Sequence, residues 1–148
     1  MTAEDKDGRI SAGTVNWVTQ ASFKPPLVAV VVKADSQLHE ITKTAGCFEL
    51  NVLGKGQQGA AYTFFKPVEP DGQTISGEAF HSGSTGAPVL DNTLAFVECR
   101  LVTTVEEGDH SIFVGEVLDA GVNQETEGRA DDATLLLKDL GEKTFYGG

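Results

Sequence analysis

The sequence predicts a mostly β fold, a β-barrel with one or two short helices inserted at one end. Two observations favour this class: several apolar, β-branched runs, and a C-terminal pair of long strands joined by a tight turn. Strands and helices do not alternate regularly, as a parallel α/β sheet would require. With 148 residues, the chain is expected to form a single domain, 1–148, that can bury one core.

The first half of the chain contains three predicted strands and one helix. Residues 13–23 (GTVNWVTQASF) form the first strand, and residues 27–34 (LVAVVVKA) are an apolar run typical of a strand buried on both faces. A short helix follows, with Ser36 as its N-cap and Gly46 at its C-terminal end. Residues 47–53 (CFELNVL) alternate between apolar and polar side chains and predict a third strand.

The second half begins with a glycine-rich turn and a second short helix at residues 57–65. Residues 67–88 are rich in Gly, Pro, Ser and Asp, and we expect them to form a long loop. Residues 94–105 and 110–122 are two long strands joined by EEGD, which predicts a hairpin. The last predicted strand is at residues 133–141 (ATLLLKDLG).

Charge and cysteine content exclude several classes of protein. The net charge of −11 argues against a nucleic-acid partner, because phosphate backbones require a basic surface. No apolar run approaches the length of about 18 residues that a membrane helix needs, and the charged N-terminus does not resemble a secretory signal. Cys47 and Cys99 lack the spacing of a metal site, so we expect two free thiols in a reducing cytoplasm.

Residues 54–59 (GKGQQG) match the GxGxxG pattern of dinucleotide-binding turns, and they lie between a predicted strand and a predicted helix. A true dinucleotide fold requires a second parallel strand that ends in an acidic residue about 20 positions later. Pro67, Pro70 and Gly72 occupy that region instead. We therefore interpret the match as coincidental.

A candidate anion site lies at the start of the first predicted helix. Ser36 and His39 are in its first turn, and Lys33 is three residues upstream of the cap. A helix N-terminus offers unpaired N–H groups and a positive dipole end, so these residues could hold a phosphate. The alternative is an ordinary serine N-cap with an exposed histidine.

The first predicted strand carries unusually many hydrogen-bonding side chains around the only tryptophan of the chain. Asn16, Thr19 and Gln20 could line a planar polar ligand, with Trp17 as an apolar wall. The alternative is that some of these residues face solvent on an antiparallel sheet, although strict alternation does not hold here. His39, His81 and His110 lack the spacing of a metal site.

Residues 13–57, 85–102 and 106–120 and the final YGG together resemble, in order, the flavin-reductase-like, FMN-binding split-barrel family. The family includes flavoredoxins, the flavin domain of high-molecular-weight rubredoxins and the flavin reductase domain of flavo-diiron proteins. The resemblance implies a split β-barrel that acts as a homodimer with flavin near the subunit interface. Family members carry a further strand segment upstream, so we expect the first barrel strand to be truncated at the N-terminus.

The resemblance also implies roles for individual residues. The edge of the isoalloxazine ring is assigned to four consecutive residues: Asn16, Trp17, Val18 and Thr19. The phosphate is assigned to Ser36 and His39, and the ribityl chain or phosphate to Asn51, Lys55 and Gln57. His110 is assigned to the flavin or the nicotinamide pocket, and the alternative for His110 is a structural hydrogen bond in the turn.

The function implied is an NAD(P)H-dependent flavin reductase, in which NADH or NADPH passes a hydride to flavin N5. FMN is the expected flavin, and FAD remains an alternative. One alternative function is a tight-FMN electron carrier that accepts electrons from a redox protein such as rubredoxin. Another is a non-enzymatic flavin-binding dimer module. No acid, base or nucleophile is expected, because the flavin supplies the chemistry.

Overall fold

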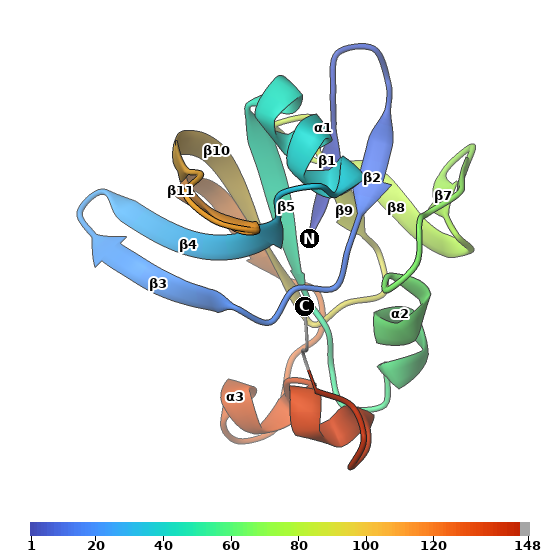
Figure 1. The fold of residues 1–148 in the computed structure, drawn as a ribbon. Coiled ribbons are helices and arrows are strands. Elements are labelled where there is room, and N and C mark those ends of the chain that lie inside the picture. Colours follow the sequence, from blue (N-terminus) through green and yellow to red (C-terminus); the bar gives the residue numbers. More distant parts are fainter. Residues whose placement is uncertain (146–148) are drawn as a thin grey trace.

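The computed structural model describes residues 1–145, which form mainly antiparallel strands with short helices around them (Figure 1). The larger sheet has the strand order β2-β1-β5-β10-β11-β4-β3. Its strands are β1 (Thr2–Glu4), β2 (Ile10–Ala12), β3 (Val18–Phe23), β4 (Pro26–Lys33), β5 (Cys47–Val52), β10 (Ala95–Val105) and β11 (His110–Val122). The smaller sheet consists of β6 (Pro70–Asp71), β7 (Thr74–Ile75), β8 (Glu78–Ser82) and β9 (Pro88–Leu90). The helices are α1 (Gln37–Ala45), α2 (Gln58–Thr63), α3 (Ala130–Ala133) and the 3-10 helix η1 (Leu137–Leu140).

The structure confirms the mostly β class with short inserted helices. β4, α1, β5, β10 and β11 lie within a residue or two of the predicted positions. The cap signals are also confirmed: Ser36 is the N-cap of α1, and Gly46 ends the helix with a positive φ of 70°. Within residues 1–145, no helix is both long and apolar enough to cross a membrane.

Two element predictions in the second half are wrong. Residues 133–141 form the end of α3 and then η1 instead of a strand, because the Asp139 carboxylate accepts a hydrogen bond from the Leu136 N–H group (2.9 Å) and closes a helical turn. Residues 67–88 are not a plain loop. They contain β6, β7 and β8, and glycines with positive φ form the turns between them: Gly72 at 59° and Gly77 at 91°.

The first predicted strand is shorter than expected, and two short strands precede it. Residues 13–17 lie outside the ladder, because Thr14 is bound to the segment at α2 instead. Its N–H group donates to the Phe64 carbonyl (3.1 Å) and its hydroxyl to the Ala61 carbonyl (2.7 Å). β1 and β2 pair with each other, and β1 also meets β5 at Thr2 and Glu49.

The main core lies where α1 packs against the larger sheet. It contains buried side chains from β4, α1, β5, β10 and β11: Val30, Val32, Leu38, Ile41, Phe48, Leu50, Cys99 and Phe113. A second cluster joins α2 to the smaller sheet through Phe64, Ile75, Phe80 and Leu90. The chain segment 11–17 runs between these two clusters and borders the candidate site.

Candidate functional site

A cavity of about 510 Å³ lies between the segment 11–17, the end of β4, the start of α1 and the segment after α2. We call it the candidate cavity, and its lining residues are 11–17, 31–33, 35–38 and 64–67. It brings together three residues that the sequence had assigned to one ligand: Asn16, Trp17 and Ser36. Its volume is typical of a site for a small organic molecule or cofactor.

The start of α1 forms one end of the candidate cavity. Ser36 is extended (φ −87°, ψ 150°), and its hydroxyl oxygen accepts a hydrogen bond from the His39 N–H group (3.2 Å) while donating to the Lys33 carbonyl (2.7 Å). The next two residues, Gln37 and Leu38, also line the cavity. Their N–H groups have no acceptor within the helix, so they and the helix dipole favour an anion at this end.

Two lysines from different elements line the same cavity. Lys33 ends β4, and its ammonium lies 3.4 Å from the exposed Asp35 carboxylate. Lys66 follows α2. Asp35 also lines the cavity and offsets Lys33, so Lys66 supplies the remaining positive charge near the start of α1.

The segment before β3 supplies backbone donors. Among the described residues, the N–H groups of Val15 and Asn16 have no hydrogen-bond partner, and both residues line the candidate cavity. The Trp17 carbonyl accepts from the Val31 N–H group (3.0 Å), which fixes this segment beside β4. The two N–H groups could therefore bind the polar edge of a planar ligand.

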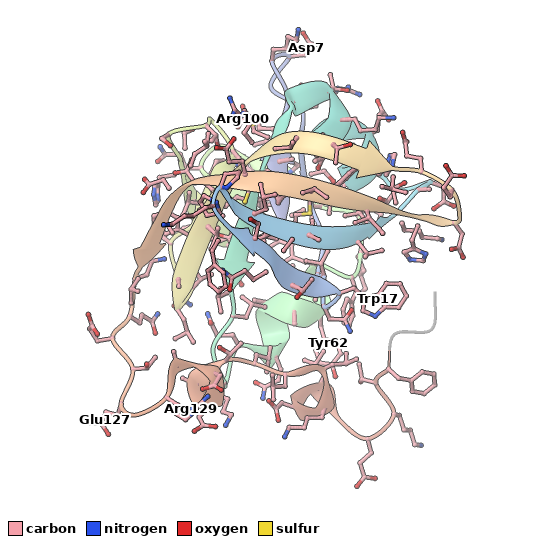
Figure 2. The ribbon with its side chains drawn as sticks, turned by 90° about the vertical axis from the view of Figure 1, so that its left-hand side faces the viewer. Asp7, Trp17, Tyr62, Arg100, Glu127 and Arg129 are labelled. Atoms are coloured by element: carbon pink, nitrogen blue, oxygen red, sulfur yellow. The ribbon has the colours of Figure 1, made fainter. Side chains whose placement is uncertain are left out.

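Trp17 projects from the chain just before β3 and is 47% exposed (Figure 2). Its indole packs against the His110 imidazole, with ring centroids 5.3 Å apart and planes tilted by 48°. His110 begins β11, and its Nδ1 lies 3.0 Å from the Asp109 carboxylate. Trp17 lines the candidate cavity and His110 does not, so His110 reaches the site only through its contact with the Trp17 ring, which we call the Trp17–His110 wall.

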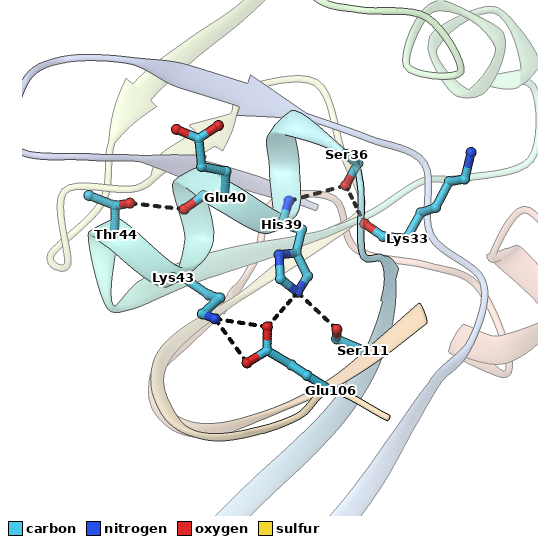
Figure 3. Close-up of polar contacts among 8 residues, drawn as sticks. All are labelled: Lys33, Ser36, His39, Glu40, Lys43, Thr44, Glu106 and Ser111. Carbon is cyan, nitrogen blue, oxygen red and sulfur yellow. Dashed lines mark hydrogen bonds and ion pairs between the residues drawn. The ribbon is translucent and has the colours of Figure 1, made fainter. Parts of the chain in front are cut away.

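The His39 imidazole does not line the candidate cavity. It is buried between α1 and the β10–β11 hairpin, where Nε2 lies 2.8 Å from the Ser111 hydroxyl and 3.4 Å from the Glu106 carboxylate (Figure 3). Glu106 in turn accepts two hydrogen bonds from Lys43 (2.8 and 2.9 Å). Burial lowers the pKa of His39, and the charge of Glu106 offsets part of that effect. Phosphate binding by this side chain stays a prediction, since only its backbone N–H group contacts the Ser36 cap.

The remaining assigned residues lie outside the candidate cavity. Val18, Thr19 and Asn51 border a second, mostly apolar cavity of about 410 Å³ on the other side of segment 12–16. The Asn51 side chain links β1 to β9, since it donates to the Thr2 hydroxyl (3.0 Å) and accepts from the Leu90 N–H group (2.8 Å).

The GKGQQG turn is fixed by hydrogen bonds to other parts of the protein. The Gln57 carbonyl oxygen Oε1 accepts from the Gly54 N–H group, and its Nε2 donates to the Asn92 carbonyl. The Lys55 N–H group donates to the Ala133 carbonyl (2.8 Å). Neither Lys55 nor Gln57 lines the candidate cavity, so the ligand contacts assigned to them stay predictions.

Residues 64–67, which line the cavity opposite α1, were not predicted as site residues from the sequence. Their signal was weak but present: Phe65, Lys66 and Pro67 combine an exposed ring, a cation and a helix stop directly after a predicted helix. A contribution from the backbone around Asn16 was expected from the sequence, and the position of Val15 at the cavity was not.

Comparison with known proteins identifies the family of the chain. The family described as "Flavin reductase like domain" matches residues 1–141. The flavin reductase of Pseudomonas putida is 32% identical over 136 residues, which cover 92% of this chain and 75% of that protein. The NADH-dependent FAD reductase of Streptomyces globisporus is 35% identical over 109 residues, or 72% of this chain and 60% of that protein. Against diflavin flavoproteins of Synechocystis and Nostoc, the chain spans only 17% to 21% of the relative's length.

Solved structures of similar fold are also flavin reductases. The Streptomyces globisporus NADH:FAD oxidoreductase superimposes with a TM-score of 0.71 at 32% identity, over 82% of this chain and 67% of that chain. The styrene monooxygenase flavin reductase of Pseudomonas putida superimposes with a TM-score of 0.70 at 30% identity, over 82% and 76% of the two chains. The family match extends over residues 1–141, which is nearly the whole chain. This chain therefore belongs to the flavin reductase-like domain family.

Proposed function

We propose that this protein binds a flavin in the candidate cavity and catalyses its reduction by NADH or NADPH. The observation that carries the proposal is the cavity itself, which is lined both by Val15 and Asn16, whose N–H groups have no partner among the described residues, and by the start of α1. The start of α1 suits the phosphate of a flavin nucleotide. The backbone N–H groups suit the polar edge of its ring. Relatives named as flavin reductases in the same family support this assignment.

Different residues of the chain bind different parts of the flavin. The N–H groups of Val15 and Asn16 donate to the polar ring edge, where negative charge increases on reduction. The start of α1 and Lys33 bind the phosphate, and the Trp17 ring, packed against His110, supplies an apolar side of the cavity. A bound flavin supplies the redox chemistry, because its N5 accepts the hydride that the nicotinamide donates.

A visible spectrum with anaerobic nucleotide addition tests the proposal. The purified protein is mixed with FMN or FAD, freed of unbound flavin and titrated with NADH and with NADPH without oxygen. We expect flavin binding and bleaching by at least one nucleotide. Bound flavin that neither nucleotide bleaches would favour the alternative, an electron carrier reduced by a protein partner. A protein that binds no flavin refutes the proposal.

The phosphate contact has its own test, because riboflavin lacks the phosphate of FMN. Lys33→Met is expected to weaken FMN binding about fivefold, which corresponds to about 1 kcal/mol for a half-exposed charge pair. Riboflavin affinity is expected to stay unchanged. The matched control is Lys6→Met, which removes an exposed lysine between β1 and β2 that does not line the cavity. Equal losses for FMN and riboflavin would contradict the phosphate assignment.

We further propose that the protein acts as a homodimer in a reducing compartment such as the cytoplasm. Apolar side chains on β10 and β11 support the first part: the cross-strand partners Val105 and Ile112 are 45% and 40% exposed, and Leu118 is 52% exposed. The free thiols of Cys47 and Cys99 support the second. Sedimentation equilibrium tests the dimer, with Ile112→Lys expected to shift it toward monomer. A monomeric wild-type protein at micromolar concentration would refute the dimer.

A further inference from the structure

The first turn of α1, which forms the anion end of the candidate cavity, depends on the rest of the fold for its position. α1 has 9 residues, and helices shorter than about 12 residues are marginal on their own. Its apolar side chains Leu38 and Ile41 are buried in the main core, but hydrophobic contacts have no preferred direction. A hydrogen bond from the same turn adds the direction that these contacts lack.

The His39 imidazole supplies this hydrogen bond. Its Nε2 lies 2.8 Å from the Ser111 hydroxyl on β11, and both side chains are buried (Figure 3). Within residues 1–145, this is the only buried hydrogen bond between a side chain of α1 and another part of the chain. The other such bonds belong to exposed ion pairs, which hold a segment weakly.

His39 is joined to the anion end through its backbone as well. Its N–H group donates to the Ser36 hydroxyl, and that hydroxyl donates to the Lys33 carbonyl at the end of β4. Lys33 is the ladder partner of His110, the residue before Ser111. The helix cap, the end of β4 and the start of β11 therefore form a closed loop of contacts, and the His39 side chain closes it.

Neighbouring groups hold the imidazole in this direction, outside the candidate cavity. Its ring packs against the Phe113 ring, with centroids 5.0 Å apart and planes tilted by 32°. Two charged groups face it: the Glu106 carboxylate, 3.4 Å from Nε2, and Lys43, which binds that carboxylate. Burial lowers the pKa of His39 from 6.5, so the ring is neutral at neutral pH and offers no positive charge to a phosphate.

We propose that His39 is a positioning residue for the phosphate end of the site. Its imidazole holds the first turn of α1 against β11, so that the backbone N–H groups of Gln37 and Leu38 meet the phosphate of a flavin nucleotide. The imidazole itself does not contact the phosphate. Loss of the His39–Ser111 bond frees the first turn and weakens the phosphate contact, while contacts with the flavin ring stay. The inference rests on the proposed flavin-binding function.

Equilibrium binding of oxidised FMN and riboflavin tests the proposal, because only FMN carries a phosphate. His39→Leu removes the imidazole, and Ser111→Ala removes the hydroxyl but keeps the imidazole. We expect each variant to raise the FMN dissociation constant about fivefold, a change typical of a lost contact at a helix terminus, and to leave riboflavin affinity unchanged. In steady-state reduction, the KM for FMN is expected to rise while kcat stays near the wild-type value.

Three further variants separate positioning from other roles. His39→Gln places an amide, which is both donor and acceptor, at a similar reach, so its FMN affinity is expected to be near that of wild type. The double variant His39→Leu/Ser111→Ala is expected to lose no more than the weaker-binding single variant, because both changes remove the same bond. Thr44→Ala is the matched control: it removes a hydroxyl whose hydrogen bond lies within α1, and it is expected to bind both flavins as wild type does.

The outcomes distinguish this inference from the proposed function. If both single variants bind FMN as wild type does, or lose FMN and riboflavin affinity equally, the positioning role is overturned while flavin binding stands. The role is also overturned if the double variant adds the two losses, or if His39→Gln binds FMN as weakly as His39→Leu, since a contact specific to the imidazole is then required. If His39→Leu does not fold, Ser111→Ala decides the comparison. If the wild-type protein binds no flavin, the proposed function itself fails.

Discussion

Glu49 gives the sharpest physical prediction, because its carboxyl group is fully buried in the middle of β5. Neither of its oxygens has a hydrogen-bond partner among the described residues. Glu98 lies directly opposite on β10, and its carboxylate accepts four hydrogen bonds from Ser84 and Thr85. Glu98 is therefore held ionised with a lowered pKa, whereas for Glu49 the nearby Met1 amino group offsets only part of the effect of burial.

Burial raises the pKa of Glu49 from 4.5 to about 8, and the negative charge of Glu98 adds to the effect. The folded protein therefore keeps a proton that the unfolded chain has released above pH 4.5. Stability from this group is fully present below pH 4.5 and is lost as pH rises toward 8. At about 1.4 kcal/mol per pH unit, the loss amounts to about 5 kcal/mol above pH 8.

Glu49→Gln removes this titration with little change in shape. We expect the free energies of unfolding of wild type and variant to be similar at pH 4.5, and the variant to gain about 1.4 kcal/mol relative to wild type for each pH unit above that value. Urea denaturation at several pH values between 4.5 and 8.5 measures the difference, and titrating groups that do not interact with Glu49 cancel in the comparison because both proteins share them.

Glu98→Gln is the matched control on the neighbouring strand. Because the pKa of Glu98 is lowered, its contribution is present at neutral pH and is lost as pH falls, so this variant is expected to be less stable than wild type at pH 7 and to approach it in acid. If the difference in free energy of unfolding between Glu49→Gln and wild type stays constant with pH, the reasoning is refuted, because a buried carboxyl that titrates would make that difference change with pH.

Two further predictions concern packing and strand linkage. A Cβ added at Gly115 lies 2.5 Å from the buried Phe48 ring, whereas one at Gly121 meets the half-buried Phe96 ring, which can move. Gly115→Ala is therefore expected to lower the free energy of unfolding by about 1–3 kcal/mol, and Gly121→Ala by less, in parallel urea titrations. Asn51→Ala is expected to cost about 1–3 kcal/mol, because it leaves a buried N–H group of β9 without an acceptor. A variant as stable as wild type would show that the Asn51 link contributes nothing.

The sequence predicted those elements whose signals are local and strong. β4 is a continuous apolar run, α1 carries both of its caps, and β10 and β11 are long strands around a short polar turn. β1 and β2 were not predicted because each has three residues, too few to show a period. Residues 133–141 were predicted as a strand because a short apolar run does not distinguish a strand from a helical turn.

In the candidate site too, features with local sequence signals were predicted, and features that depend on distant contacts were not. The Ser36 cap was predicted because all of its partners lie within three residues of it. The direction of the His39 imidazole could not be predicted, since Glu106 and Ser111 are about seventy residues away in sequence. Segment 64–67 joined the site only through the fold, which brings the end of α2 opposite α1.

The long-range contacts that the sequence could not reveal are the ones that fix the dimensions of the site. Lys33, at the end of β4, is the cross-strand partner of His110, at the start of β11. The positive end of the candidate cavity and the Trp17–His110 wall are therefore attached to one ladder. The His39–Ser111 hydrogen bond ties α1 to the same strand. Because these parts cannot move independently without breaking ladder or buried hydrogen bonds, the distance from anion site to ring wall is set by strand register.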